Sequence, residues 1–171
     1  MEIKEGDEVL EVGTGSGYVA ANIKKHFRDV VSTVVATDIS PFAVRAAKKE
    51  GLEVIRTDIF VGICKKFSLI LFNPPYLELE EWEKQGDWLE KAIDGGKGGI
   101  EVLTRFIRGL REAMSEGGRA IVIVSSHTSG EVFRVIREQG FGYRILARKK
   151  LFFEELYAVR IEKPAESASS L

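Results

Sequence analysis

The sequence predicts an α/β fold: a mostly parallel seven-stranded sheet with helices on both faces and an antiparallel pair of strands at the end. Short apolar runs alternate with helical patterns over most of the chain, which is typical of parallel strands joined by crossover helices. The last two apolar runs, residues 143–147 and 156–161, follow one another without a helix between them. Two such successive strands pair antiparallel.

Length and composition agree with one compact domain. The chain has 171 residues, 44% hydrophobic and 30% charged, and this balance excludes disordered and fibrous classes. Its 25 basic and 26 acidic side chains nearly cancel, so no general positive field attracts a nucleic-acid backbone. We expect the domain to occupy residues 1–164 and the small polar residues 165–171 to form a flexible tail.

The composition predicts neither a metal site nor a membrane segment. With Cys64 as the single cysteine and two histidines, neither an intramolecular disulfide nor a Cys/His zinc set is expected. The charged N-terminus and the lack of an apolar run of about 18 residues argue against a signal peptide and a membrane span. We therefore expect a cytoplasmic protein that binds no metal and no membrane.

The first elements follow from apolar periodicity. Residues 9–12 form a first strand, and an apolar stripe predicts a helix over residues 17–27. The β-branched run at residues 30–37 suits a buried parallel strand.

The second helix has clear start and stop signals. Ser40 can accept hydrogen bonds from its first backbone amides, Pro41 suits the first helical position, and Gly51 can end it in a left-handed conformation. Residues 52–55 follow as a third strand, and the wholly apolar run 67–72 as a central fourth strand.

The second half predicts two more helices. An apolar stripe indicates a helix from Ile100, which we expect Gly117 and Gly118 to end, before a fifth strand at residues 120–124. A further helix covers residues 130–139. Three arginines of the first of these helices are expected to face solvent: Arg105, Arg108 and Arg111.

Residues 77–99 have no clear period and predict a long irregular connection. Connections of that length inside a compact domain are often functional. The acid-rich part with Trp82 and Trp88 has two interpretations, a mobile surface loop or a substrate lid, and the sequence does not choose between them.

Three glycines at alternate positions, Gly13, Gly15 and Gly17, mark the turn from the first strand into the first helix. Glycines permit positive φ and let a ligand approach the backbone at a helix N-terminus. The dinucleotide fingerprint requires a glycine at position 18, where this chain has Tyr18. The loop resembles instead that of S-adenosyl-L-methionine-dependent methyltransferases.

Two aspartates follow the next two strands, on the same edge of the predicted sheet. Asp38 can accept hydrogen bonds from both ribose hydroxyls of an adenosine cofactor. Asp58 can accept the adenine amino group, with Ile39 and Ile59 on the faces of the ring. Alone, Asp38 could be an ordinary loop carboxylate and Asp58 a turn residue. The ordered set with the glycine loop favours a cofactor pocket.

The fourth strand ends in Asn73-Pro74-Pro75-Tyr76, the sharpest functional signal in the chain. The prolines fix φ and lack donors, which leaves the Asn73 side-chain oxygen and the Pro74 carbonyl as rigid acceptors. They match both donors of a planar NH₂ group, a poor nucleophile that gains from alignment with a methyl donor. Tyr76 can stack on the flat substrate group. The alternative interpretation is a rigid loop start without chemistry.

At these residues the chain resembles the HemK-type protein glutamine N5-methyltransferases, whose class I members share an (Asn/Asp)-Pro-Pro-aromatic signature. Residues 94–99 and 152–156 are also similar to that family, and the resemblance covers essentially the whole chain. It implies the class I, Rossmann-like methyltransferase fold, with S-adenosyl-L-methionine as cofactor and S-adenosyl-L-homocysteine as product. It implies the catalytic residues Asn73, Pro74, Pro75 and Tyr76, and the cofactor-binding residues Glu11, Gly13, Thr14, Gly15, Gly17, Asp38, Ile39, Asp58, Ile59 and Asn73.

The chain is similar to the short archaeal and eukaryotic branch of this family, which implies a substrate and a partner. The implied substrate is the glutamine of the Gly-Gly-Gln motif in a class-1 translation termination (release) factor. The implied partner is a small zinc-binding activator protein that forms a heterodimer. Because the third strand is expected at an edge of the sheet, we expect the activator at residues 52–55, with Leu52, Val54 and Ile63 as candidate contacts.

Three alternatives stay open. RNA and DNA amino-methyltransferases that act on adenine N6 or guanine N2 share the tetrad, but a nucleic-acid enzyme working alone should carry a basic surface, and this chain is nearly neutral. Some eukaryotic relatives are implicated in lysine methylation. A non-catalytic subunit is disfavoured by the intact Asn73 and glycine loop.

Overall fold

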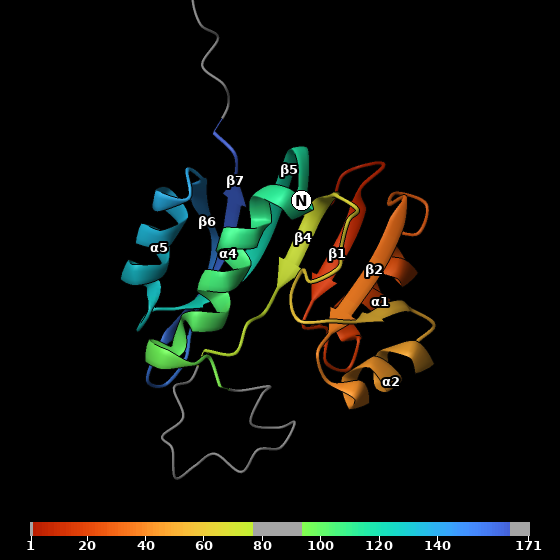
Figure 1. The fold of residues 1–171 in the computed structure, drawn as a ribbon, viewed down its shortest axis with the longest axis horizontal. Helices are drawn as coiled ribbons and strands as arrows, with labels where there is room; N and C mark the ends of the chain where they lie inside the picture. Colours follow the sequence, from red (N-terminus) through yellow and green to blue (C-terminus); the bar gives the residue numbers. More distant parts are fainter. Residues whose placement is uncertain (1, 77–93, 165–171) are drawn as a thin grey trace, which may run out of the picture.

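The computed structural model describes residues 2–76 and 94–164, and these form a seven-stranded sheet with helices packed against it (Figure 1). The strand order is β3-β2-β1-β4-β5-β7-β6, in which β7 runs antiparallel to both of its neighbours and the other pairs are parallel. The strands are β1 (Glu8–Val12), β2 (Thr33–Asp38), β3 (Glu53–Arg56), β4 (Phe67–Phe72), β5 (Met114–Ser125), β6 (Gly142–Lys150) and β7 (Glu155–Glu162). The predicted fold class is confirmed.

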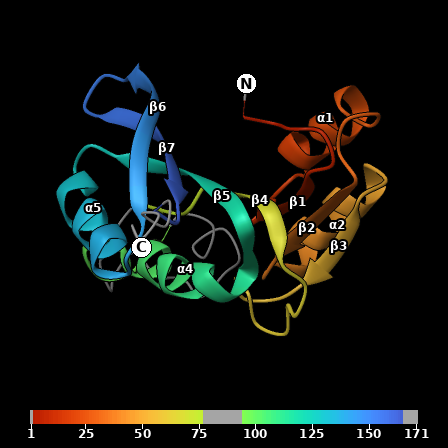
Figure 2. The same cartoon turned by 90° about the horizontal axis from the view of Figure 1, so that it is seen from above.

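Helices cover the two faces of the sheet. They are α1 (Tyr18–His26), α2 (Pro41–Lys49), α4 (Glu101–Ala113) and α5 (Ser129–Glu138), with a short 3₁₀ turn, η2 (Lys97–Gly99), before α4. Side chains alternate between faces along a strand. Val9 therefore packs with Ala20 of α1 and Ala47 of α2, whereas the next residue, Leu10, packs in a second core with Phe106 of α4. Figure 2 shows α1 and α4 on opposite sides of the sheet.

The local signals of the second helix are confirmed. The Ser40 hydroxyl accepts hydrogen bonds from the amides of Phe42 and Ala43, and Gly51 has a left-handed φ of 76°. The strand before it starts later than predicted, at Thr33 rather than at residue 30. Strand β3 lies at the predicted edge of the sheet.

The end of α4 differs from the sequence prediction. We expected Gly117 and Gly118 to end this helix, but it ends at Ala113 and both glycines lie inside β5. Met114, the last apolar position of the helical stripe, has extended backbone angles (φ −92°, ψ 130°) and pairs with Phe67. The pairing register shifts after this residue, so the glycines form an irregularity in a strand.

A buried ion pair joins the N-terminal segment to the amino end of the sheet. The Arg119 guanidinium on β5 donates to both carboxylate oxygens of Asp7, at 2.8 and 2.5 Å. It also donates to the backbone carbonyls of Ser68 and Glu2. Burial acts to raise the pKa of Asp7, but hydrogen bonds from Arg119, the Lys4 amide and Ser68 outweigh it and lower the pKa.

Two sequence predictions fall outside the described residues: the C-terminal tail at 165–171, and most of the long connection, with Trp82 and Trp88.

Within the described part, no helix is long and apolar enough to cross a membrane. The same residues contain no group of three His, Cys, Asp or Glu side chains placed to hold a metal ion.

Candidate functional site

A cavity opens at the carboxyl ends of β1, β2 and β4, the edge where open α/β sheets bind ligands. Its volume is about 210 Å³. The lining residues are Val12, Gly13, Asp38, Ile39, Thr57, Asp58, Ile59, Phe72, Pro75, Asp94, Val102 and Arg105.

The glycine loop lies between β1 and α1, beside this cavity. Gly13, Gly15 and Gly17 have φ angles of 63°, 57° and 84°, a region that side chains disfavour. A Cβ atom on Gly17 would lie 2.9 Å from the Ala47 backbone, and one on Gly13 would lie 3.1 Å from the Phe72 ring. A Cβ atom on Gly15 would meet nothing within 4 Å. The outer glycines thus permit close packing, and the middle one leaves open space.

Glu11 and Thr14 contact the glycine loop from its buried side and do not line the cavity. The Glu11 carboxylate is 7% exposed and accepts hydrogen bonds from the Thr14 hydroxyl at 2.5 Å and the Ala20 amide at 3.0 Å. Burial raises the pKa of Glu11; these hydrogen bonds oppose the rise, and the Asp38 carboxylate adds to it. The carboxylate satisfies a backbone amide in the first turn of α1.

Asp38 ends β2 and connects the loop to the cavity. One carboxylate oxygen accepts the Gly15 amide at 2.9 Å and the other accepts the Ser40 amide at 2.8 Å. A carboxylate oxygen has two lone-pair sites, so each oxygen can accept one more hydrogen bond. Asp38 is therefore fixed by the backbone and still able to bind hydroxyl groups in the cavity.

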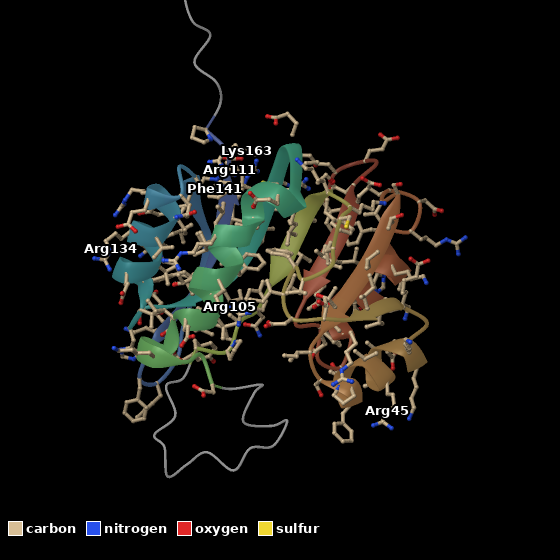
Figure 3. The ribbon with its side chains drawn as sticks, in the orientation of Figure 1. Arg45, Arg105, Arg111, Arg134, Phe141 and Lys163 are labelled. Carbon is tan, nitrogen blue, oxygen red and sulfur yellow. The ribbon has the colours of Figure 1, made fainter. Side chains whose placement is uncertain are left out.

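Asp58 is paired with an arginine that was expected to face solvent. Nη2 of Arg105 lies 2.5 Å from Oδ2 of Asp58, and both residues line the cavity. Their side chains are 47% and 39% exposed. Figure 3 labels Arg105 in the lower part of α4, near the carboxyl ends of the strands. The pair connects the loop after β3 to α4, and it leaves Oδ1 of Asp58 as a further acceptor.

Two isoleucines contribute apolar walls. Ile39 follows β2 and is 40% exposed, and Ile59 lies in the loop after β3. Ile59 has a φ of 51°, which a β-branched residue rarely adopts. Such strain persists where the surroundings impose it and is common at ligand sites. With Val12 and Phe72, these side chains form an apolar slot flanked by carboxylates.

The Asn73-Pro74-Pro75-Tyr76 segment leaves β4 at the rim of the cavity. Phe72 and Pro75 line the cavity, whereas Asn73, Pro74 and Tyr76 do not. Asn73 is exposed, Pro74 is buried, and the other two residues are half-buried. The Asn73 amide is therefore accessible beside the cavity rather than part of its wall.

The glycine-rich segment before α4 packs against this tetrad. A Cβ atom on Gly95 would lie 2.9 Å from the Pro75 carbonyl oxygen and 2.7 Å from that of Gly99, so only glycine fits there. The Asp94 carboxylate accepts the Gly96 amide at 2.9 Å and lines the cavity. The resemblance pointed to this segment without giving it a role, and the structure places it at the site.

The sequence prediction missed one whole wall of the cavity. Val102 and Arg105 lie three residues apart on α4, the helix that follows the glycine-rich segment 94–99. Their spacing puts them on the same face of a helix, which is the one local signal that relates them. Thr57 also lines the cavity and was not predicted.

Comparison with known proteins identifies relatives over nearly the whole chain. The family model "Methyltransferase small domain" matches residues 1–153. A Methanocaldococcus jannaschii protein, named for protein N5-glutamine methyltransferase activity, is 37% identical over 93% of this chain and 82% of its own length. The release factor glutamine methyltransferase of Clostridium acetobutylicum is 28% identical over 82% of this chain. This chain covers 54% of that bacterial protein, about half its length.

A solved structure agrees with these relatives. The E. cuniculi Mtq2-Trm112 complex, responsible for methylating the eRF1 translation termination factor, matches with a TM-score of 0.72 and 28% identity. The match covers 93% of this chain and 86% of that one. Together with the sheet order found here, these similarities show that the chain belongs to the methyltransferase small domain family and, within it, to the HemK-type protein glutamine methyltransferases that use S-adenosyl-L-methionine.

Proposed function

We propose that this enzyme methylates the side-chain amide nitrogen of the glutamine in the Gly-Gly-Gln motif of a class-1 translation termination factor. The observation that carries the proposal is the accessible Asn73 amide at the rim of a cavity whose walls suit an adenosine group. The relatives named for release factor and eRF1 methylation support the choice of substrate. Such a substrate places the reaction in the cytoplasm.

The cavity residues fit the cofactor's adenosine end. Ile39 and Ile59 would enclose the adenine ring, Asp58 would accept its amino group, and Asp38 would accept the ribose hydroxyls. The open space at Gly15, beside the cavity, suits the methionine part of the cofactor. When bound, the cofactor supplies an electrophilic methyl group on a sulfonium sulfur.

The tetrad would align the nucleophile. The Asn73 side-chain oxygen and the Pro74 carbonyl accept the two amide hydrogens, and the rigid prolines keep these oxygens in place. The glutamine nitrogen would gain this methyl group, the cofactor would be left as its neutral thioether, S-adenosyl-L-homocysteine, and one amide proton would leave to water. The two acceptors favour the positive charge that develops on nitrogen.

The direct test is methyl transfer from labelled S-adenosyl-L-methionine in one mixture of termination factor and bulk RNA, with and without a zinc-binding activator. We expect label in the factor and none in a matched factor whose motif glutamine is changed to alanine. Label in RNA, or in the factor at lysine, would instead favour one of the alternative functions.

We also infer that the zinc-binding activator docks on β3. This strand is an edge of the sheet, its residues are mostly exposed, and Ile55 is 46% exposed. An exposed edge offers unpaired backbone groups for strand addition. We expect Ile55→Lys to abolish co-purification of the activator. The matched control is Val19→Lys, since Val19 is 44% exposed but lies on α1 rather than on β3. Co-purification that survives Ile55→Lys would contradict this docking site.

A further inference from the structure

The turn between β6 and β7 exposes two neighbouring phenylalanines. Phe152 is 92% exposed and Phe153 is 83% exposed. Their ring centroids lie 4.6 Å apart at an interplanar angle of 85°, an edge-to-face contact. Single exposed apolar residues are common, whereas these two rings contact each other and form one continuous apolar patch on the surface.

Hydrogen bonds fix this turn to the end of β5. The Leu151 amide donates to the Glu154 carbonyl at 2.8 Å, and the Ser125 hydroxyl donates to the Glu154 carboxylate at 2.6 Å. Ser126 and Glu155 exchange two more bonds: the Ser126 amide donates to the Glu155 carbonyl, and the Glu155 amide to the Ser126 hydroxyl. The rings are therefore presented on a preorganised turn, which lowers the entropy lost on binding.

Cations border the two rings. Arg148, Lys149 and Lys150 are exposed at the end of β6, whereas Glu154 and Glu155 are half-buried. Within residues 2–76 and 94–164, no carboxylate forms an ion pair with Lys149 or Lys150. A partner that covers this surface must therefore present acidic groups next to an apolar patch.

The turn lies on the catalytic edge of the sheet. Phe72, which precedes Asn73, pairs with Val122 of β5, and β7 pairs with β5 as far as Ser125. The turn thus begins about three residues, or roughly 10 Å, beyond the level of Phe72 and two strand spacings, again about 10 Å, to the side. Figure 1 shows the β6–β7 turn at the same end of the molecule as the start of α4.

The two halves of this edge differ. The cavity occupies the β1–β2 half, the tetrad leaves β4 in the middle, and the β6–β7 turn lies on the other half. Among the described residues, the β6–β7 half is the part of this edge next to Asn73 that the cavity does not occupy, and a macromolecule that presents an amide to Asn73 from outside the cavity can contact it there.

We propose that residues 148–153, the hairpin tip, form a docking surface for the termination factor, through an acidic and apolar face next to its target glutamine. This inference rests on the proposed function. The aromatic pair supplies apolar contact area, and the cations orient the termination factor and raise the rate at which it meets the enzyme.

The test separates docking from chemistry by using two substrates: the whole termination factor and a short peptide that contains Gly-Gly-Gln. The variants are Phe152→Ser/Phe153→Ser and Lys149→Glu/Lys150→Glu. The matched controls are Phe42→Ser, at a phenylalanine that is 58% exposed on α2, and Lys48→Glu/Lys49→Glu on the same helix. Thermal unfolding verifies that every variant is folded.

We expect both hairpin-tip variants to raise KM for the whole factor at least tenfold. Their kcat for the factor, their kinetics with the peptide and their cofactor affinity should stay within twofold of wild type. The defect of the charge reversal should also depend on salt. The control variants should behave as wild type does.

Unchanged kinetics with the factor, or an equal loss with factor and peptide, would overturn the docking surface while leaving the proposed function intact. The same holds if the hairpin-tip variants lose affinity for RNA and keep their affinity for the factor. A wild-type enzyme that methylates neither substrate is a different result, because it removes the proposed function and the docking surface together.

Discussion

Two aspartate–arginine pairs with the same closest distance serve opposite ends of this sheet. Asp7 and Arg119 meet at 2.5 Å at the amino end, with side chains that are 4% and 1% exposed. Asp58 and Arg105 also meet at 2.5 Å, at the carboxyl end, with side chains that are 39% and 47% exposed. Both pairs join an aspartate to an arginine, but they differ in burial, so exposure to solvent determines how much each pair contributes to stability.

Burial makes the first pair hard to break and leaves the second easy to rearrange. Removing one member of a buried pair strands a charge away from water, which costs about 3–5 kcal/mol. An exposed pair contributes about 0–1 kcal/mol, because water solvates either partner alone. We infer that the Asp7–Arg119 pair stabilises the fold, whereas the Asp58–Arg105 pair can adjust to a ligand.

The largest expected effect is on the buried pair. Arg119→Ala leaves Asp7 buried without its partner and should lower the free energy of unfolding by about 3–5 kcal/mol, as measured by urea denaturation. Replacing both partners together, as Asp7→Asn/Arg119→Met, should recover part of this loss. A cost below about 1 kcal/mol for Arg119→Ala would mean that burial does not explain the difference between the pairs.

The second-largest expected effect is the loss of activity on replacing Asn73, at the carboxyl ends of the strands. Asn73→Ala should lower kcat about 10²–10³-fold, since it removes an acceptor that favours the developing charge. Cofactor affinity should stay within a few-fold and the free energy of unfolding within about 0.5 kcal/mol, because Asn73 is exposed and outside the cavity wall. Steady-state kinetics, cofactor titration and urea unfolding measure the three quantities. Undiminished transfer would refute the catalytic role.

A smaller effect is expected for the exposed pair. Arg105→Ala should raise KM for S-adenosyl-L-methionine on the order of tenfold, leave kcat within twofold and change the free energy of unfolding by less than about 1 kcal/mol. Arg105→Lys should restore part of the affinity. Arg108→Ala, an exposed arginine on the same helix, is the control and should be neutral. If Arg105→Ala instead destabilises the fold as Arg119→Ala does, the two pairs have the same role.

The smallest effects concern pH and have opposite signs at two carboxyl groups. The lowered pKa of Asp7 gives stability that is present above its ordinary value of 3.8 and is lost as pH falls through the lowered pKa. The raised pKa of Glu11 gives stability that is present below its ordinary value of 4.5 and is lost as pH rises through the raised pKa.

Free energies of unfolding between pH 2 and 7 test this contrast. Asp7→Asn should remove part of the fall in stability toward low pH, and Glu11→Gln should remove part of the fall toward neutral pH. Parallel pH profiles for these two variants would show that the opposite environments of the carboxyl groups have no consequence for stability.

Most of the fold could be predicted because its signals are local. Ser40, Gly51 and the apolar runs set helix and strand positions through backbone preference and periodicity, and every predicted strand and helix is present, although β2 starts later and β5 earlier than expected. The end of α4 was mispredicted because Met114 satisfies both the helical stripe and the strand. Pairing with Phe67 decides between them, and that contact is not encoded locally.

The sequence also indicated part of the cavity lining and missed another part. Asp38, Ile39, Asp58 and Ile59 line the cavity as the sequence indicated, because each follows a strand whose end is fixed by pattern. Asn73 was expected in the site and lies at its rim instead. That difference depends on how the chain turns after β4.

The sequence alone determined the fold class, the strand ends that carry polar groups, and the resemblance to a methyltransferase family. Only the tertiary structure decided that Arg105 meets Asp58, 47 residues away, that Arg119 meets Asp7, 112 residues away, and that the hairpin tip shares an edge with Asn73. The physical reason is that periodicity and backbone preference act over a few residues. Contacts between distant residues follow from strand order and register, which the whole core selects together.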